Sequence, residues 1–277
     1  MRIDAHHHLW QYNPEEYDWI DDSMVVLKKN FLIEELQQTL ANNHIDGSIA
    51  VQARQSIEET NWLLSLANSS AEIKGVVGWI DLKSETLNHQ LKQCKSHKKL
   101  VGFRHVIQGE TDPDFMRNDK FIHGLKALAE HGYCYDLLIY AHQLPSAIEM
   151  LAKVPDLRVV IDHIAKPNIK TGDEFSRWQY GMKTLAKNPN VYCKVSGMVT
   201  EADWQNWQYE NFVPYLDTIF QYFGENRVMF GSDWPVCLVA GDYSKVKQII
   251  HDYLSNKNQQ TIGNVFGLNA AKFYQLD

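Results

Sequence analysis

Short runs of apolar and β-branched residues recur along the chain, and longer stretches with helical spacing separate them. The runs predict eight strands, over residues 2–8, 48–53, 75–81, 101–106, 133–140, 158–163, 191–196 and 228–233. The stretches between them predict helices, among them residues 31–43, 57–68, 119–131, 144–153 and 243–254. Each connection is long enough for the crossover that joins two parallel strands.

Two of the predicted strands contain uninterrupted apolar runs, Val159-Val160-Ile161 and Val228-Met229-Phe230, as is typical of a sheet covered on both faces. Eight strand–helix units within 277 residues predict an α/β protein, a single (β/α)₈ TIM barrel that spans residues 1–277 as one domain. An open, doubly wound sheet is the alternative. The chain has no glycine-rich phosphate loop, internal repeat or low-complexity linker.

Polar residues close most of the predicted strands, where the active sites of such barrels form. The first strand ends in His6-His7-His8. Because side chains alternate along a strand, His6 and His8 should face the same way and could share a divalent metal or a substrate oxygen. A tag remnant or an accidental polar strand would also give such a run. The other strand ends contribute Gln52, Arg54, Trp79, Asp81, Arg104, His105, Asp162, His163, Asp233 and Trp234.

Composition narrows the class of partner. Hydrophobic residues make up 44% of the chain, charged residues 22%, and the net charge of −7 argues against nucleic acid or an anionic membrane as a partner. No apolar run is long enough to cross a bilayer, and the four cysteines have no paired spacing. We therefore expect a cytoplasmic protein with reduced thiols. Its oligomeric state stays open, a homodimer included.

Together these motifs resemble the amidohydrolase superfamily, in its amidohydrolase 2 branch of sugar-acid lactonases. The resemblance covers nearly the whole chain, through Asp-Ala-His-His-His-Leu-Trp from residue 4, Val-Gln-Ala from 51, Gly-Phe-Arg-His from 102, Val-Ile-Asp-His-Ile-Ala-Lys-Pro from 160 and Gly-Ser-Asp-Trp-Pro from 231. The most similar groups are the L-fuconolactonases, the L-rhamnonolactonases and the 2-pyrone-4,6-dicarboxylate lactonases. The resemblance implies an enzyme of carbohydrate metabolism that hydrolyses the ester bond of a small sugar lactone.

The departures from that superfamily concern metal binding. Members with two metal ions carry a carbamylated lysine on the fourth strand, where this chain has Arg104, which stays protonated and cannot bridge metals. Metal-bearing members end the fifth strand in a histidine, whereas here Tyr140 ends it and His142 follows two residues later. The candidate metal ligands are His6, His8 and Asp233, with His163 and His142 in reserve. These suit one Zn²⁺ ion, and a metal-free site that uses cations and imidazoles is the alternative.

Lactone hydrolysis needs an activated water, a stabilised oxyanion and a protonated leaving oxygen. We expect Asp233 to be the general base, although an aspartate before Trp-Pro could also cap a helix. We expect His163 to polarise the carbonyl or bind metal and Arg104 to stabilise the oxyanion, the alternatives being a buried structural histidine and a salt bridge. The candidate substrate-binding residues, which offer aromatic faces or hydrogen bonds, are Trp10, Gln52, Trp79, His105, His142 and Trp234.

Two further functions stay open at this point. The first is a metal-dependent decarboxylase of the same branch, which the missing histidine of the fifth strand disfavours. The second is a non-catalytic barrel that binds a sugar acid, which the presence of His6, His8 and Asp233 disfavours. The mixture of aromatic and polar residues suits a neutral, polyhydroxylated lactone better than a dicarboxylate, which would need more cations than Arg54 and Arg104 provide.

Overall fold

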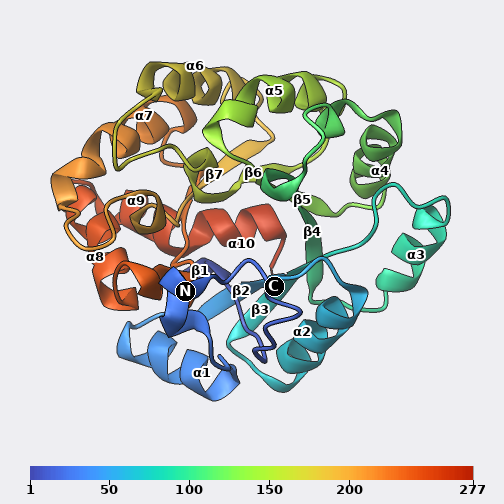
Figure 1. The fold of residues 1–277 in the computed structure, drawn as a ribbon, viewed down its shortest axis with the longest axis horizontal. Coiled ribbons are helices and arrows are strands. Elements are labelled where there is room, and N and C mark those ends of the chain that lie inside the picture. The colour runs from blue at the N-terminus through green and yellow to red at the C-terminus, as the bar shows by residue number, and fades with distance from the viewer. Residues whose placement is uncertain (277) are drawn as a thin grey trace.

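The computed structural model describes residues 1–276, and a parallel sheet of eight strands in chain order forms its centre (Figure 1). The strands are β1 (Ile3–His7), β2 (Gly47–Val51), β3 (Ile73–Gly78), β4 (Leu100–Val106), β5 (Cys134–Leu138), β6 (Val159–Ile161), β7 (Val191–Val195) and β8 (Val228–Phe230). A parallel bridge between His7 and Trp234 joins the residues after β8 to β1. The sheet is therefore a nearly closed (β/α)₈ barrel, as predicted, and not the open, doubly wound alternative.

Helices surround the barrel as an outer layer (Figure 1). The α-helices are α1 (Ile33–Asn42), α2 (Ile57–Ser69), α3 (Leu87–Cys94), α4 (Asp119–Glu130), α5 (Leu144–Ala152), α6 (Phe175–Leu185), α7 (Val213–Phe223), α8 (Tyr243–Tyr253), α9 (Gln259–Gly263) and α10 (Asn269–Tyr274). Side-chain caps start several of them, since Ser56, Asn118 and Asp242 accept backbone N–H groups at the first turns of α2, α4 and α8. No helix within residues 1–276 is long and apolar enough to cross a membrane.

The short helix α10 closes one end of the barrel. It crosses the middle of the molecule in Figure 1, and its Phe273 and Tyr274 pack against strand side chains such as Ile3 and Val160. Arg158, one residue before β6, donates a hydrogen bond to the carbonyl of Phe273, which places α10 at the amino ends of the strands. The carboxyl ends of the strands, where the sequence predicts the active site, are the opposite end.

The strands β6 and β8 are shorter than the sequence predicts. Each has three residues, and the chain leaves the sheet before Asp162 and before Asp233. The reason is backbone conformation, because His163 and Asp233 have φ angles of +50° and +57°, which a strand does not allow. The hydrophobic pattern does not reveal this change, since the residues after both strands remain buried.

Candidate active site

A bulge in β1 determines where its histidines point. The pairing of β1 with β2 slips by one residue between Asp4 and His7. Before the slip, Ala5 packs with the apolar side chains next to α10. After it, His6 and His8 reach the same site, and their Nε2 atoms lie 3.2 Å apart. The prediction that His6 and His8 face the same way is therefore confirmed, although the register shift includes His6.

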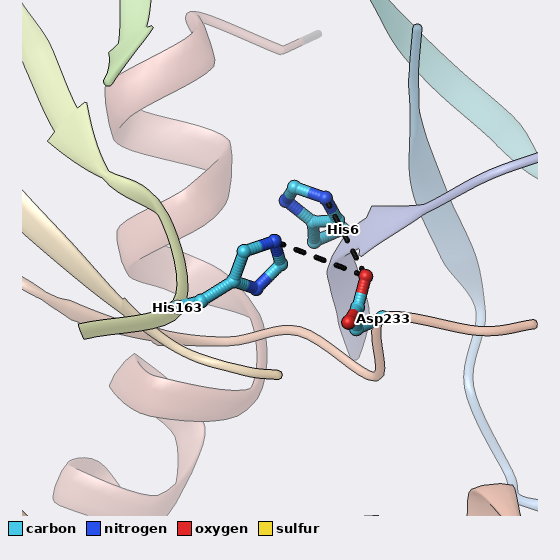
Figure 2. Close-up of side chains that lie close together, drawn as sticks. All are labelled: His6, His163 and Asp233. Atoms are coloured by element: carbon cyan, nitrogen blue, oxygen red, sulfur yellow. Dashed lines mark ion pairs between the residues drawn. The ribbon is translucent and has the colours of Figure 1, made fainter. Parts of the chain in front are cut away.

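Three segments that are far apart in the sequence bring His6, His163 and Asp233 together (Figure 2). The Oδ1 atom of Asp233 lies 3.9 Å from Nε2 of His6 and 3.8 Å from Nε2 of His163. It also lies 3.5 Å from Nε2 of His8. All four side chains are at least 94% buried. We call these four residues the upper cluster.

Hydrogen bonds on the far side of the His8 and His163 rings fix the direction of their Nε2 atoms. Nδ1 of His8 lies 2.8 Å from the carbonyl oxygen of Val51, which can only accept, so Nδ1 carries the proton and Nε2 presents a lone pair. Nδ1 of His163 lies 2.9 Å from the hydroxyl of Ser196. The Oδ1 atom of Asp233 is buried without a hydrogen-bond partner among residues 1–276. Nitrogen and oxygen lone pairs that converge without a shared donor are the arrangement that a metal ion stabilises.

Burial keeps the His6 and His163 imidazoles neutral. It lowers the pKa of His163 to about 4 and that of His6 well below 6.5. Burial also tends to raise the pKa of Asp233, but His163 and His8 outweigh it and hold that pKa below 3.8. At neutral pH the ionised carboxylate of Asp233 therefore lies beside the neutral imidazoles of His6 and His163, the protonation states that metal ligands require.

The backbone of this site is strained where it presents the functional side chains. The four consecutive residues from His163 to Lys166 all have positive φ, and so does Asp233. Only small neighbours allow this close approach: a Cβ atom on Gly197 would lie 2.5 Å from Nδ1 of His163, and one on Gly231 would lie 2.7 Å from Cβ of His6. Such conformations persist where the surrounding structure enforces them, and they are concentrated at active sites.

The carboxylate of Asp4 fixes the segment after β8 to β1. It accepts the backbone N–H and the hydroxyl of Ser232 at 2.8 and 2.6 Å, and the hydroxyl of Tyr243 at 3.0 Å. Because Ser232 precedes Asp233 directly, these bonds hold the catalytic candidate against the strand that carries His6. Asp4 is fully buried and acts on the site through the backbone.

Beneath the upper cluster lies a second group of buried charges, formed by Arg104, Asp136, Asp162 and Lys194, which we call the lower layer. The Nζ atom of Lys194 donates to Asp136 and lies 2.9 Å from Oδ1 of Asp162. Nη1 of Arg104 donates to Oδ2 of Asp162 at 3.1 Å. Burial raises the pKa of Asp162, but Lys194, His6 and Arg104 outweigh it, and the pKa lies well below 3.8. The lower layer is thus an array of ion pairs.

His6 connects the two groups. Its Nε2 atom belongs to the upper cluster and lies 3.3 Å from Nη1 of Arg104. Its Nδ1 atom lies 3.0 Å from Nζ of Lys194 and 3.3 Å from Oδ1 of Asp162. Nδ1 of His6 thus faces both a donor, the Lys194 ammonium, and an acceptor, the Asp162 carboxylate, while Nε2 faces Asp233.

Several of the predicted site residues do not lie on an open surface. Trp10 is fully buried, and its indole N–H donates to the carbonyl of Lys29. Trp234 is 2% exposed and packs edge-on against Phe31. These two tryptophans, predicted to bind substrate, are buried among packing neighbours in this structure.

The other predicted binding residues are distributed over both sides of the strands. Gln52 is fully buried and donates to the carbonyl of Arg104, with its own Oε1 free of partners among residues 1–276. His105 stacks on Phe115 and bonds to Glu110, so its ring is engaged with the β4–α4 connection. Trp79 is half-buried, and its indole N–H donates to Nδ1 of His105 at 3.4 Å. His142 is exposed, and its ring stacks on that of Tyr140.

Sequence reasoning missed Asp136, Lys194 and Ser196, and it gave Asp162 no role. One signal was available, because Lys194 and Asp136 are isolated charged residues within the apolar strands β7 and β5. An isolated charge in a strand buried on both faces requires a buried partner. Ser196 offered no comparable signal.

Residues 3–276 match the model of the amidohydrolase family. The chain belongs to this family. It is 36% identical to the L-fucono-1,5-lactonase of Burkholderia multivorans over 100% of this chain and 96% of that protein. It is 31% identical to the L-fucono-1,5-lactonase of Burkholderia ambifaria, with the same coverage. A crystal structure of an amidohydrolase from Burkholderia multivorans with bound zinc superposes with a TM-score of 0.97, at 36% identity and 100% coverage of both chains. The resemblance found in the motifs is confirmed.

Proposed function

We propose that this protein hydrolyses the ester bond of a sugar-acid lactone of the L-fucono-1,5-lactone type, at a site that holds one Zn²⁺ ion. The observation that carries the proposal is the convergence of the Asp233 carboxylate with the Nε2 atoms of His6, His8 and His163. Identity to two L-fucono-1,5-lactonases over the whole chain supports the substrate class. The zinc in the similar Burkholderia multivorans structure supports the metal.

The donor set of the upper cluster fits one zinc ion. Zn²⁺ prefers imidazole nitrogen and carboxylate oxygen in catalytic sites and leaves a position open for water or substrate. The unpartnered Oδ1 of Asp233 and the inward lone pair of His8 meet this preference. When bound, such an ion would polarise the lactone carbonyl and lower the pKa of an attacking water.

The side chains supply the proton transfers and the orientation. Asp233 is ionised at neutral pH and accepts the proton of the attacking water as general base. His163 is neutral and is held by Ser196, which fixes its ring beside Asp233. Arg104 directs its guanidinium to Asp162 and to the carbonyl of Gln52, so we assign it an electrostatic role beneath the substrate.

The rim after β6 and β7 supplies polar groups for the sugar hydroxyls. Lys166 follows His163 closely in the sequence and pairs with Glu201 at 3.2 Å, with both side chains about 16–17% exposed. The Nζ atom of Lys166 also lies 5.1 Å above the ring centre of Tyr140. A cation, a carboxylate and an aromatic ring at one edge suit a ring that carries hydroxyls and one apolar side.

The decarboxylase and the non-catalytic barrel are not favoured. Both full-length curated relatives described above are lactonases. A barrel that only binds a sugar acid would not need an unpartnered buried carboxylate beside neutral imidazoles, because burial of such a group destabilises the fold.

The test is turnover of a panel of lactones, followed with a pH indicator. We expect kcat/KM for L-fucono- or L-rhamnono-lactone to exceed that for butyrolactone by at least about 10³, because hydroxyl-binding groups left unpaired would weaken the transition state. In the same assay, Asp233→Asn removes the proposed base and should lower turnover at least about 10²-fold. Equal rates on sugar lactones and butyrolactone would contradict the substrate class, and normal turnover by folded Asp233→Asn would contradict the role of the base.

A further inference from the structure

Lys194 is a fully buried lysine in the interior of the barrel, and the proposed chemistry does not use it directly. Its ammonium is surrounded by two carboxylates and one imidazole, from Asp136, Asp162 and His6. The pKa of Lys194 lies above 10.5, since Asp136 and Asp162 outweigh the effect of burial. The group is therefore a permanent cation at the bottom of the active site.

The three partners of this ammonium form a set of metal-ligand type. One ligand atom from each of His6, Asp136 and Asp162 lies within 4.8 Å of the other two. Nζ of Lys194 lies 3.0 Å from the Nδ1 of His6 and 2.9 Å from the Oδ1 of Asp162. The second oxygen of Asp136 is fully buried and has no hydrogen-bond partner among residues 1–276, which is a second sign of unused ligand capacity.

The charges of the barrel interior divide into two parts, of which only the lower is balanced. In the lower layer, Lys194 and Arg104 offset Asp136 and Asp162. In the upper cluster, the Asp233 carboxylate faces three imidazoles and pairs with no lysine or arginine among residues 1–276, so a divalent ion is attracted to that cluster. Coulomb repulsion from the ammonium in the lower layer opposes a second divalent ion there.

We propose that the Lys194 ammonium fills a second cation site, formed by His6, Asp136 and Asp162, and thereby limits the protein to one divalent metal ion. The same ammonium fixes the His6 ring from below, so that Nε2 keeps its orientation towards Asp233. Lys194 is in this sense a positioning residue and a substitute for a metal ion.

The proposal predicts that removal of the ammonium opens the site. Lys194→Ala leaves the three ligands and the volume of four methylenes and an ammonium, which an ion and its waters can occupy. Metal–ligand bonds of about 2.0–2.2 Å are shorter than the distances to Nζ, so the carboxylates would have to move inwards by less than about 1 Å. Two carboxylates and the Nδ1 atom of His6 suit Mn²⁺ or Zn²⁺. With an ion at each site, the His6 ring would release its proton to solvent and bind one ion through each nitrogen.

The experiment is elemental analysis of protein equilibrated with Zn²⁺ or Mn²⁺ and then desalted. Wild-type protein should retain no more than one equivalent per chain, and Lys194→Ala should retain one equivalent more. The double variant Lys194→Ala/Asp136→Asn lacks one ligand and should return to the wild-type number. Lys194→Met fills the volume without charge and should also show no additional ion.

Thermal unfolding gives an independent readout. Added Mn²⁺ or Zn²⁺ should raise the Tm of Lys194→Ala by about 5 °C or more beyond its effect on wild type, because the ion binds the folded state alone. An equal metal content in Lys194→Ala and wild type would overturn the proposal, as would an additional ion that persists in the double variant. Lys194→Ala that stays insoluble when expressed and refolded with metal would also overturn it, since an ion should then replace the ammonium.

Discussion

The upper cluster and the lower layer are both buried, yet they differ in whether their carboxylates have a cationic partner. In the lower layer, Lys194 contacts two carboxylates and Arg104 donates to one of them. In the upper cluster, Asp233 has three imidazole nitrogens within 3.9 Å but pairs with no lysine or arginine among residues 1–276. Burial by itself therefore does not distinguish a structural charge from a chemical one.

The difference extends to the backbone. Asp136 and Lys194 lie within the regular strands β5 and β7. His163 and Asp233 lie just beyond β6 and β8, in the left-handed conformation that few residues other than glycine adopt. The Asp136–Lys194 ion pair thus lies in regular strands, whereas Asp233 lies in strained backbone. This contrast supports the proposal that the lower layer positions the site and that the upper cluster performs the chemistry.

The largest effect that we expect is on stability, from Lys194→Met. The change leaves Asp136 and Asp162 buried with one cation fewer, so the free energy of unfolding should fall by about 3–5 kcal/mol in urea denaturation. Lys99→Met is the matched control, because Lys99 is only partly buried and bonds to backbone carbonyls instead of carboxylates. An equal loss from both variants would show that the ion pairs of the lower layer have no special weight.

Glu59, a buried carboxylate outside both groups, tests how burial changes the pH dependence of the free energy of unfolding. Glu59 accepts the N–H groups of Ala53 and Arg54, and burial raises its pKa to about 7 from 4.5. Between these values unfolding releases a proton, so stability should fall as pH rises, by about 1.4 kcal/mol per pH unit. Glu59→Gln removes this slope. The difference in unfolding free energy between wild type and Glu59→Gln should therefore shrink from pH 5 to pH 7.5, and parallel curves would contradict the shift.

Ser196→Ala tests how the upper cluster is oriented. Loss of the hydroxyl frees Nδ1 of His163, whose ring can then turn away from Asp233. Zinc affinity or kcat should fall about 10- to 100-fold, the usual effect of losing a partner behind a metal-binding histidine. Ser196→Thr keeps the hydroxyl and should restore most of the loss. Full activity in Ser196→Ala would mean that packing alone orients the ring.

Much of this architecture was predictable from the sequence. Continuous apolar strands predicted the barrel, and polar residues at strand ends pointed to His6, His8, His163 and Asp233. Both features can be read from short stretches of sequence, because the alternation of side chains and the end of a strand are local properties. The bulge in β1 did not disturb this prediction, since His6 and His8 keep their relative orientation after the slip. Local patterns therefore suffice for residues whose place depends on a single strand.

What the sequence could not provide is pairing between residues on different strands. Lys194 and Asp136 lie on strands separated by β6, and their contact depends on the order of the strands in the sheet. The same holds for Trp10, which looked available at a strand end but is covered by the segment that contains Phe31. How exposed a side chain is and which partners it contacts depend on the folded barrel. Residues chosen for their chemistry alone therefore included some, such as Trp10, that are fully buried.

The most direct test of the difference between the two groups is the stability of Asp233→Asn in chelator-treated protein. A buried carboxylate without a cationic partner destabilises the fold, so its neutralisation should cost no stability. Asparagine also adopts the left-handed conformation more readily than most residues. The account predicts a free energy of unfolding equal to that of wild type or up to about 1 kcal/mol higher. A loss of about 3 kcal/mol or more, as expected for Lys194→Met, would contradict it by showing that Asp233 is a paired structural charge.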